Sequence, residues 1–128
     1  MNEDMDPKAV EEGKVLAWLS YLGILFLVPL FTQRQNPYTM FHVRQGIVLF
    51  GVWIVGFVVG ILQLILHIII SMIDIPYAGC CVDLGLGVLQ IAIYILALVL
   101  SIIGIVKSLS GEMWKMPMLA AIAEKIKL

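Results

Sequence analysis

Charged residues are scarce in this 128-residue chain, at 13% of the sequence, and three long segments contain no Asp, Glu, Lys or Arg. The three segments are Val15–Phe31, Gly46–Ile73 and Leu84–Val106. A soluble domain is about one quarter charged, whereas a run of about 20 apolar residues can cross a bilayer as a helix. The scarcity of charge excludes an ordinary soluble domain and predicts an all-α integral membrane protein with three transmembrane helices.

Residues that carry chemistry are also few. The two cysteines, Cys80 and Cys81, are adjacent and belong to no CxxC pair or metal-ligand spacing. The sequence has two histidines, no phosphate-binding loop, no pairing of a nucleophile with a base, and no basic patch that would suit a nucleic acid. We therefore expect no enzyme activity, no cofactor, no metal site and no nucleic-acid partner.

The segments between the apolar runs are too short to form a second domain. We expect an acidic tail over residues 1–14 and a single helical membrane domain over residues 15–128. Residues 118–128 place apolar side chains on one helical stripe and are too few to span a bilayer. This pattern predicts an amphipathic C-terminal helix in the plane of the membrane.

A second short helix is expected at the loop between the first two runs. Asn36 is a favoured helix cap and Pro37 suits the first helical turn, so a helix should begin at Pro37. Its first turns have the mixed composition of a membrane interface. They either form a short interfacial helix that bends near Gly46, or simply extend the second span.

The positive charges predict an orientation. With three spans, the loop over residues 32–45 and the segment from Lys107 onward lie on one side and carry six of the eight Lys and Arg residues. Cytoplasmic segments are enriched in these residues. We therefore expect the N-terminus outside and the C-terminus in the cytoplasm, with anionic lipids at the cytoplasmic face.

Small and polar residues repeat along one face of each of the last two runs. Helices in lipid associate through small residues and interhelical hydrogen bonds, so these two faces should form a packing seam. Depth along the hairpin pairs His67 with Gln90 and Gln63 with Tyr94. A polar pathway for a proton, a solute or a polypeptide is the functional alternative. The seam residues are Gly56, Gly60, Gln63, His67, Gln90, Tyr94, Ser101 and Gly104.

A candidate interaction junction precedes the second run, where specific polar and aromatic residues gather on the basic side. A guanidinium binds phosphate or carboxylate through two parallel hydrogen bonds. We expect Arg44 either to anchor a lipid headgroup or to close onto Glu112 or Glu124 in the C-terminal segment. The junction residues are Asn36, Pro37, Phe41, His42, Arg44 and Gln45.

Four sequence segments carry a resemblance to a known family. They are Y-L-G-I-L-F-L-V-P-L (21–30), N-P-Y-T-M-F-H-V-R-Q (36–45), G-E-M-W-K-M-P (111–117) and A-E-K-I (123–126). From about residue 15 onward the chain resembles small bacterial and archaeal membrane proteins of unknown function related to the central Tic translocon component of the chloroplast inner envelope. The resemblance implies an all-α membrane protein with no known enzyme activity and a distant link to protein import.

These observations predict a multi-pass protein in the plasma membrane of a bacterium or archaeon. The expected function is that of a non-enzymatic structural or interaction subunit, with a protein-translocation complex as the candidate assembly. The alternative is a small oligomeric pore or carrier for a solute. The expected partners are the lipid bilayer and either further copies of the chain or another membrane protein.

Overall fold

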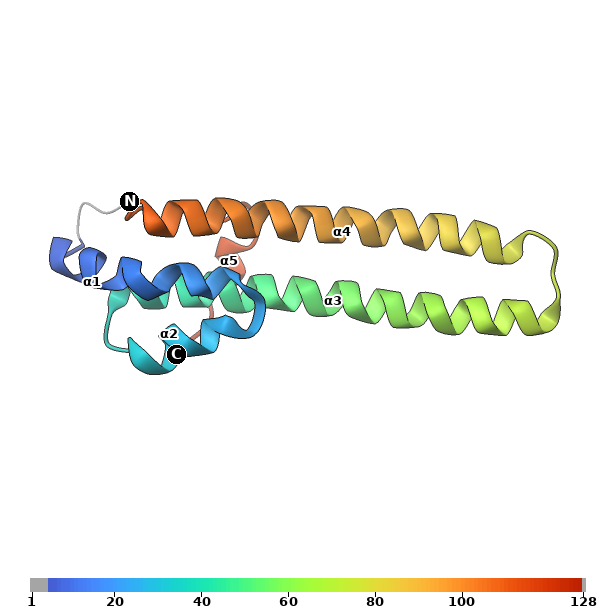
Figure 1. Ribbon diagram of the computed structural model, residues 1–128, viewed down its shortest axis with the longest axis horizontal. Coiled ribbons are helices and arrows are strands. Elements are labelled where there is room, and N and C mark those ends of the chain that lie inside the picture. The colour runs from blue at the N-terminus through green and yellow to red at the C-terminus, as the bar shows by residue number, and fades with distance from the viewer. Residues whose placement is uncertain (1–4, 128) are drawn as a thin grey trace. The chain divides into compact units, whose positions relative to one another are not determined.

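The computed structural model describes residues 5–127, which form helices and contain no strand (Figure 1). The prediction of an all-α fold is confirmed. Residues 1–4 of the predicted acidic tail and Leu128 of the predicted C-terminal helix lie outside the described residues. In chain order the elements are α1 (Pro7–Ala17), η1 (Trp18–Tyr21), η2 (Gly23–Phe26), α2 (Leu27–Thr32), α3 (Pro37–Ile73), α4 (Ala78–Leu109) and α5 (Ala120–Ala123).

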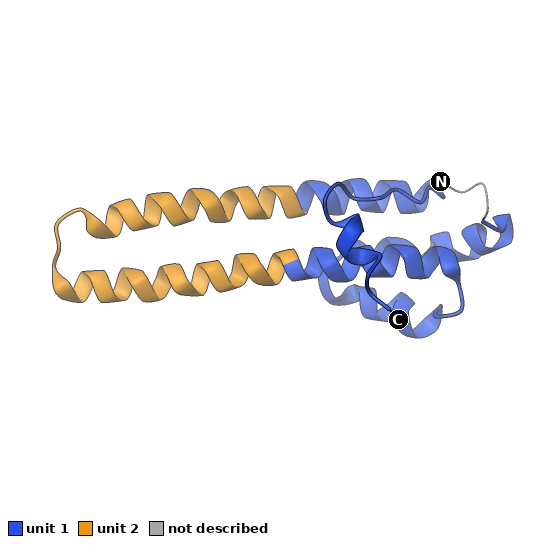
Figure 2. Cartoon of the chain, turned by 180° about the vertical axis from the view of Figure 1, so that it is seen from behind, with its two compact units in different colours: residues 1–51, 98–128 blue, residues 52–97 orange. Residues whose placement is uncertain are grey.

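The chain divides into two compact units (Figure 2). Unit 1 comprises residues 1–51 and 98–128, and unit 2 comprises residues 52–97. Helices α3 and α4 each contribute residues to both units.

The first apolar run folds back on itself inside unit 1. The helix breaks at Leu22, and Gly23 adopts a left-handed φ of 62°, which glycine reaches without steric cost. Helix α2 then packs against η1 and α1 (Figure 1). Only α3 and α4 are long and apolar enough, among the described helices, to cross a membrane. The prediction of three transmembrane helices is therefore not confirmed, because the glycine break divides a run that was barely long enough.

Unit 1 has a buried core, although its helices are short. The largest fully buried side chains include Tyr21, Tyr38, Leu49 and Met116, which come from η1, α3 and the segment after α4. Two glycines allow the close approaches within this core. A Cβ at Gly104 would lie 2.5 Å from the Tyr21 ring, and one at Gly46 would overlap the backbone carbonyl of Ser20.

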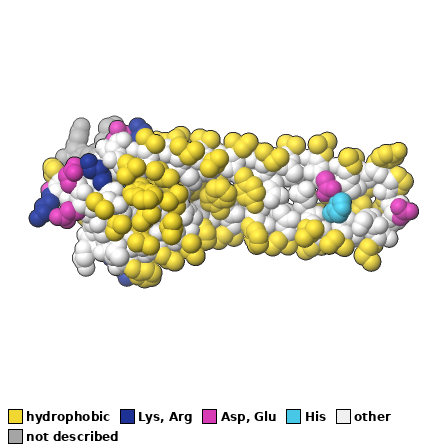
Figure 3. All heavy atoms as spheres, in the orientation of Figure 1, with side chains coloured by type: hydrophobic (Ala, Val, Ile, Leu, Met, Phe, Trp, Pro, Cys, Tyr) yellow, Lys and Arg dark blue, Asp and Glu magenta, His cyan; other side chains and the backbone are white. Residues whose placement is uncertain are grey.

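Unit 2 is an antiparallel hairpin with almost no interior. Of residues 52–97, only Gly56 and Ala97 are buried. Hydrophobic side chains line the two long edges of the hairpin face seen in Figure 3, with backbone and polar side chains between them. The turn is short, since α3 ends at Ile73 and α4 begins at Ala78. Asp74 and Tyr77 adopt positive φ within this turn. The two cysteines thus lie on the first turn of α4 and not in a long loop.

The two predicted short helices differ from expectation. Helix α3 starts at Pro37, as predicted, and continues without interruption through Gly46, so the interfacial segment extends the second span. The predicted helix over residues 118–128 is reduced to the four residues of α5. Its late start has a local cause, because Met118 has a φ of 66°, a left-handed conformation that cannot belong to a helix.

Candidate functional site

The junction begins with a cap that also fastens α1. The Asn36 side-chain oxygen accepts hydrogen bonds from the backbone N–H groups of Tyr38, at 3.0 Å, and Thr39, at 3.3 Å. These bonds satisfy two of the free donors at the start of α3. Its amide nitrogen donates to the Ala9 carbonyl of α1 at 2.8 Å. Asn36 and Pro37 therefore start α3 and fix its position in unit 1.

His42 lies at the centre of a buried aromatic cluster. Its side chain is fully buried, and its Nδ1 atom is 2.6 Å from the hydroxyl oxygen of Tyr21. The rings of Tyr21, Tyr38 and Phe41 meet the imidazole edge-on, with centroid distances of 4.7–5.7 Å. The Nε2 atom of His42 is buried as well, and within residues 5–127 it makes no hydrogen bond of good geometry, although the Glu112 backbone acts on the ring. The contacts of His42 are therefore internal, and its ring does not reach a lipid or a partner.

Gln45 binds the segment that follows α4. Its amide nitrogen donates to the Trp114 carbonyl at 2.9 Å, and its side-chain oxygen accepts from the Met116 N–H at 2.9 Å. The Gln45 amide thus bonds one backbone carbonyl and one backbone N–H of the segment after α4. Tyr38 adds a third link, because its hydroxyl donates to the Ser108 carbonyl at 2.7 Å. The junction side chains therefore hold α3, the end of α4 and the C-terminal segment together.

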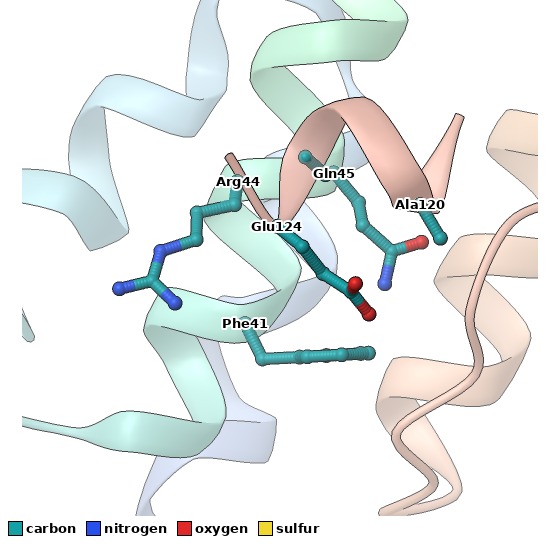
Figure 4. A pocket seen from close by; sticks show the side chains of 6 residues that line it. Phe41, Arg44, Gln45, Ala120 and Glu124 are labelled. Atoms are coloured by element: carbon teal, nitrogen blue, oxygen red, sulfur yellow. The ribbon is translucent and has the colours of Figure 1, made fainter. Parts of the chain in front are cut away.

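Arg44 and Phe41 line a small hollow between α3 and α5. Gln45, Ala120, Ala123 and Glu124 complete its wall (Figure 4). The expected ion pairs of Arg44 are not formed, because Glu124 pairs with Lys115 at 2.8 Å and Glu112 pairs with Lys107 at 2.8 Å. Asn36, His42 and Gln45 use their polar side-chain atoms within the described chain. The Arg44 guanidinium makes no polar contact there.

The predicted seam divides between the two units. Gly56 lies against Tyr94, where a Cβ would come within 2.5 Å of the ring, and Tyr94 stacks on Trp53 with a centroid distance of 5.5 Å. Gly60 lies against the Gln90 amide, 2.7 Å from a Cβ built there. In unit 1, Gly104 meets Tyr21 of η1, and the buried Ser101 hydroxyl has no partner.

The polar pairs in the hairpin differ from those expected from depth. His67 lies 2.9 Å from the Asp83 carboxylate, and the Gln63 amide donates to the Asp83 carbonyl at 3.5 Å. Gln90 donates to the Tyr94 hydroxyl, on its own helix, at 3.2 Å. The expected pairs of His67 with Gln90 and of Gln63 with Tyr94 are therefore wrong. The third apolar run begins at Leu84, but α4 begins six residues earlier, at Ala78, and therefore brings Asp83 within reach of His67.

Several residues of the site carry no recognisable sequence signal. Tyr21 is a buried partner of both His42 and Gly104, but its position in an apolar run is equally typical of an aromatic residue at a membrane interface. Gln33 donates to the Glu12 carbonyl and accepts from the Thr39 hydroxyl, and it lies in an apparently ordinary loop. Within residues 5–127, no group of three His, Cys, Asp or Glu side chains could hold a metal ion, and Cys80 and Cys81 are exposed thiols.

Comparison with known proteins gives a consistent family. The model of the magnetosome magnetite crystal formation protein family matches residues 12–123. Magnetosome protein MmsF of Paramagnetospirillum magneticum is 30% identical over 112 residues, which cover 88% of this chain and 86% of the relative. Magnetosome protein MamF of the same organism is 54% identical over 35 residues, which cover 27% of this chain and 32% of the relative. No solved structure matches the chain.

These matches overturn the resemblance to proteins related to the Tic translocon. Both the family model and the curated relatives are magnetosome proteins, and nothing among them points to a translocon component. An apolar run and an Asn-Pro helix start meet general physical needs of any membrane helix, so segments 21–30 and 36–45 do not identify one family. The expected link to a protein-translocation complex falls with the resemblance.

Proposed function

The chain belongs to the magnetosome magnetite crystal formation protein family, and from this premise we propose that it is a non-enzymatic structural or interaction subunit of the magnetosome membrane. The match over residues 12–123 carries the proposal, since it covers helices from both units. The proposed partners are the bilayer and other membrane proteins, including further copies of the chain.

Exposure of the two long helices supports a position in a membrane. Only 11% of the most apolar window of α3 and 22% of that of α4 are buried inside the protein. A core helix of a soluble protein would be mostly buried, whereas lipid covers an apolar surface without cost. The family and the two exposed apolar helices both agree with a membrane location.

We propose an orientation that follows from two crossings. A chain that crosses twice has both ends on the same side, whereas the expected external N-terminus depended on three spans. All eight Lys and Arg residues lie in residues 1–51 and 98–128, and residues 52–97 carry only Asp74 and Asp83 as charged residues. The positive-inside rule then places both ends in the cytoplasm and the acidic turn on the opposite side.

The bonding of the polar side chains favours a structural role. In unit 1, backbone groups accept hydrogen bonds from the side chains of Asn36, Gln45 and Tyr38. In the hairpin, backbone carbonyls accept hydrogen bonds from the amides of Gln63 and Gln90. No described group of these residues pairs a nucleophile with a base. An oligomeric pore or carrier remains the alternative prediction, and no contact in the hairpin favours it specifically.

Localisation tests the proposal directly. The full chain carrying a C-terminal fluorescent protein would be expressed in Paramagnetospirillum magneticum, and magnetosomes would be isolated magnetically. We expect enrichment in magnetosomes over the remaining membranes, and a change in crystal size when the chain is overproduced. The same tag on an unrelated plasma-membrane protein is the control. Equal distribution of the two fusions would refute a magnetosome function.

Reporter fusions test the orientation separately. A reporter that works only in the cytoplasm should be active at either end of the chain and inactive when inserted after Pro76 in the turn. Activity at the C-terminus alone would restore the arrangement with three spans and an external N-terminus.

A further inference from the structure

Arg44 forms no ion pair with any described residue of the chain. Its side chain is half-buried, and its Nε atom is buried without a hydrogen-bond partner. No acidic side chain of residues 5–127 forms an ion pair with it, and the two acids expected to do so are bound by lysines. A partly desolvated charge is costly when it lacks a partner. The position therefore calls for an anion from outside the described chain.

The surroundings of Arg44 fit a headgroup at a membrane surface. Arg44 lies on α3 two residues before the uncharged segment that begins at Gly46, which is where a span enters lipid. The hollow beside its stem has apolar walls from Phe41, Ala120 and Ala123. In Figure 4 the guanidinium and the Glu124 carboxylate point in different directions, so the guanidinium remains available.

The net charge around Arg44 indicates the charge of the anion that would bind there. Arg44 contributes +1, and the neighbouring Lys115–Glu124 pair contributes zero, which leaves one positive charge at the hollow. A phosphodiester carries one negative charge and presents two oxygens that match the guanidinium fork. We propose that Arg44, with the apolar surface of Phe41 and Ala120 beside its stem, binds the phosphate of an anionic phospholipid such as phosphatidylglycerol.

A lipid is favoured over free phosphate because the site has an apolar side. The glycerol and first acyl carbons of a lipid can cover the half-buried side chains of Phe41 and Ala120, whereas inorganic phosphate would leave both partly exposed. Lipid binding at Arg44 requires membrane insertion but not a role in crystal formation. The two proposals can therefore fail independently.

Lipid retention by the purified full chain tests the site. The protein in detergent would be titrated with phosphatidylglycerol or phosphatidylcholine, and bound lipid would be counted by native mass spectrometry. Wild type should prefer phosphatidylglycerol. Arg44→Gln should weaken this binding about tenfold, because a charge-assisted bidentate pair is lost, and Arg44→Lys should weaken it less, since the charge remains. Arg34→Gln, at an exposed arginine of the same unit, is the matched control and should retain wild-type binding.

Three results would overturn the proposal. The first is an equal affinity of Arg44→Gln and wild type for phosphatidylglycerol. The second is full displacement of the lipid by inorganic phosphate, which would indicate a free-anion site. The third is a wild type that does not distinguish phosphatidylglycerol from phosphatidylcholine, a result that does not depend on any variant folding.

Discussion

Unit 1 contains 15 of the 17 charged residues and nevertheless has a buried core, whereas unit 2 contains only Asp74 and Asp83 as charged residues and has almost none. Unit 1 encloses a core around Tyr21, Tyr38 and His42, with polar side chains bonded to backbone groups far away in the chain. Unit 2 encloses almost nothing, because only Gly56 and Ala97 of residues 52–97 are buried. The difference shows that apolar composition alone does not predict a core. In unit 2 lipid takes the place of an interior, as expected for membrane-spanning helices.

The helix contacts differ accordingly. In unit 1 a glycine lets backbone meet backbone, as at Gly46 and Ser20. In unit 2 glycines accommodate side-chain ends, as at Gly60 and Gln90. A backbone cannot move aside for a new methyl group, whereas a flexible amide can. Substitutions should therefore be costlier in unit 1 than in unit 2.

The largest effect is expected for Gly46→Ala. The added methyl group would overlap the Ser20 carbonyl, so α3 and η1 would have to separate. We expect a loss of about 3 kcal/mol or more in the free energy of unfolding, at the upper end of overpacking costs. Unfolding in mixed detergent micelles, followed by circular dichroism, would measure it. Gly51→Ala is the matched control on the same helix, where a Cβ meets nothing within 4 Å. Equal stability of the two variants would contradict the close contact.

A smaller loss is expected for Tyr21→Phe. The phenyl ring keeps the packing against Gly104 but leaves the buried Nδ1 atom of His42 without its 2.6 Å partner. An unsatisfied buried polar group costs about 1–3 kcal/mol. The melting temperature in detergent is a sufficient measure. Tyr77→Phe, at an 85% exposed tyrosine of unit 2, should leave it unchanged. If both variants melt alike, the Tyr21–His42 bond contributes nothing to unit 1.

Gly56→Ala should cost less than either change in unit 1. The methyl group would push the Tyr94 ring from its stack on Trp53, while alanine also improves helix propensity. We expect a net loss of about 1 kcal/mol from these opposing terms. Tryptophan fluorescence during unfolding reports on the stack. Gly85→Ala is the control in the same unit, because a Cβ there has no neighbour within 4 Å. Its free energy of unfolding should be unchanged or higher. A Gly56 variant as stable as the Gly85 variant would mean that the two helices do not meet there.

The smallest effect is expected for Asp83→Asn. The His67–Asp83 pair is half-exposed, with side-chain exposures of 52% and 40%. A partly exposed hydrogen bond contributes about 1 kcal/mol. Unfolding free energies of Asp83→Asn and of the control Asp74→Asn should therefore differ only slightly. A loss as large as that of Tyr21→Phe would show that polar bonds in unit 2 matter as much as those in unit 1.

Local chemistry explains which parts of the fold could be predicted. The start of α3 could be predicted from Asn36 and Pro37, because a helix cap and the proline after it act within one helical turn. The glycine faces of the hairpin were visible as a repeat. The pairing across the hairpin was not, because it depends on where the turn ends, and α4 begins at Ala78, five residues before Asp83.

For the candidate site, the residues could be selected from the sequence, but their contacts could not. The six junction residues were selected as specific, but their roles came from segments that no local pattern links to them. Gln45 bonds a backbone N–H 71 positions away, and Tyr38 bonds a carbonyl 70 positions away. Because these partners are backbone groups, they leave no signature in side-chain composition.

The sequence by itself determined the helical class and the preference for a membrane. Both follow from sums over many residues, since a long run without charge lowers its free energy in lipid wherever its neighbours lie. Tertiary structure alone decided that the first run folds back at Gly23, that Tyr21 meets His42, and that Arg44 stays unpaired. The Tyr21–His42 contact and the unpaired state of Arg44 among the described residues each depend on how distant segments approach one another. Such contacts are fixed by packing geometry, which composition and periodicity do not contain.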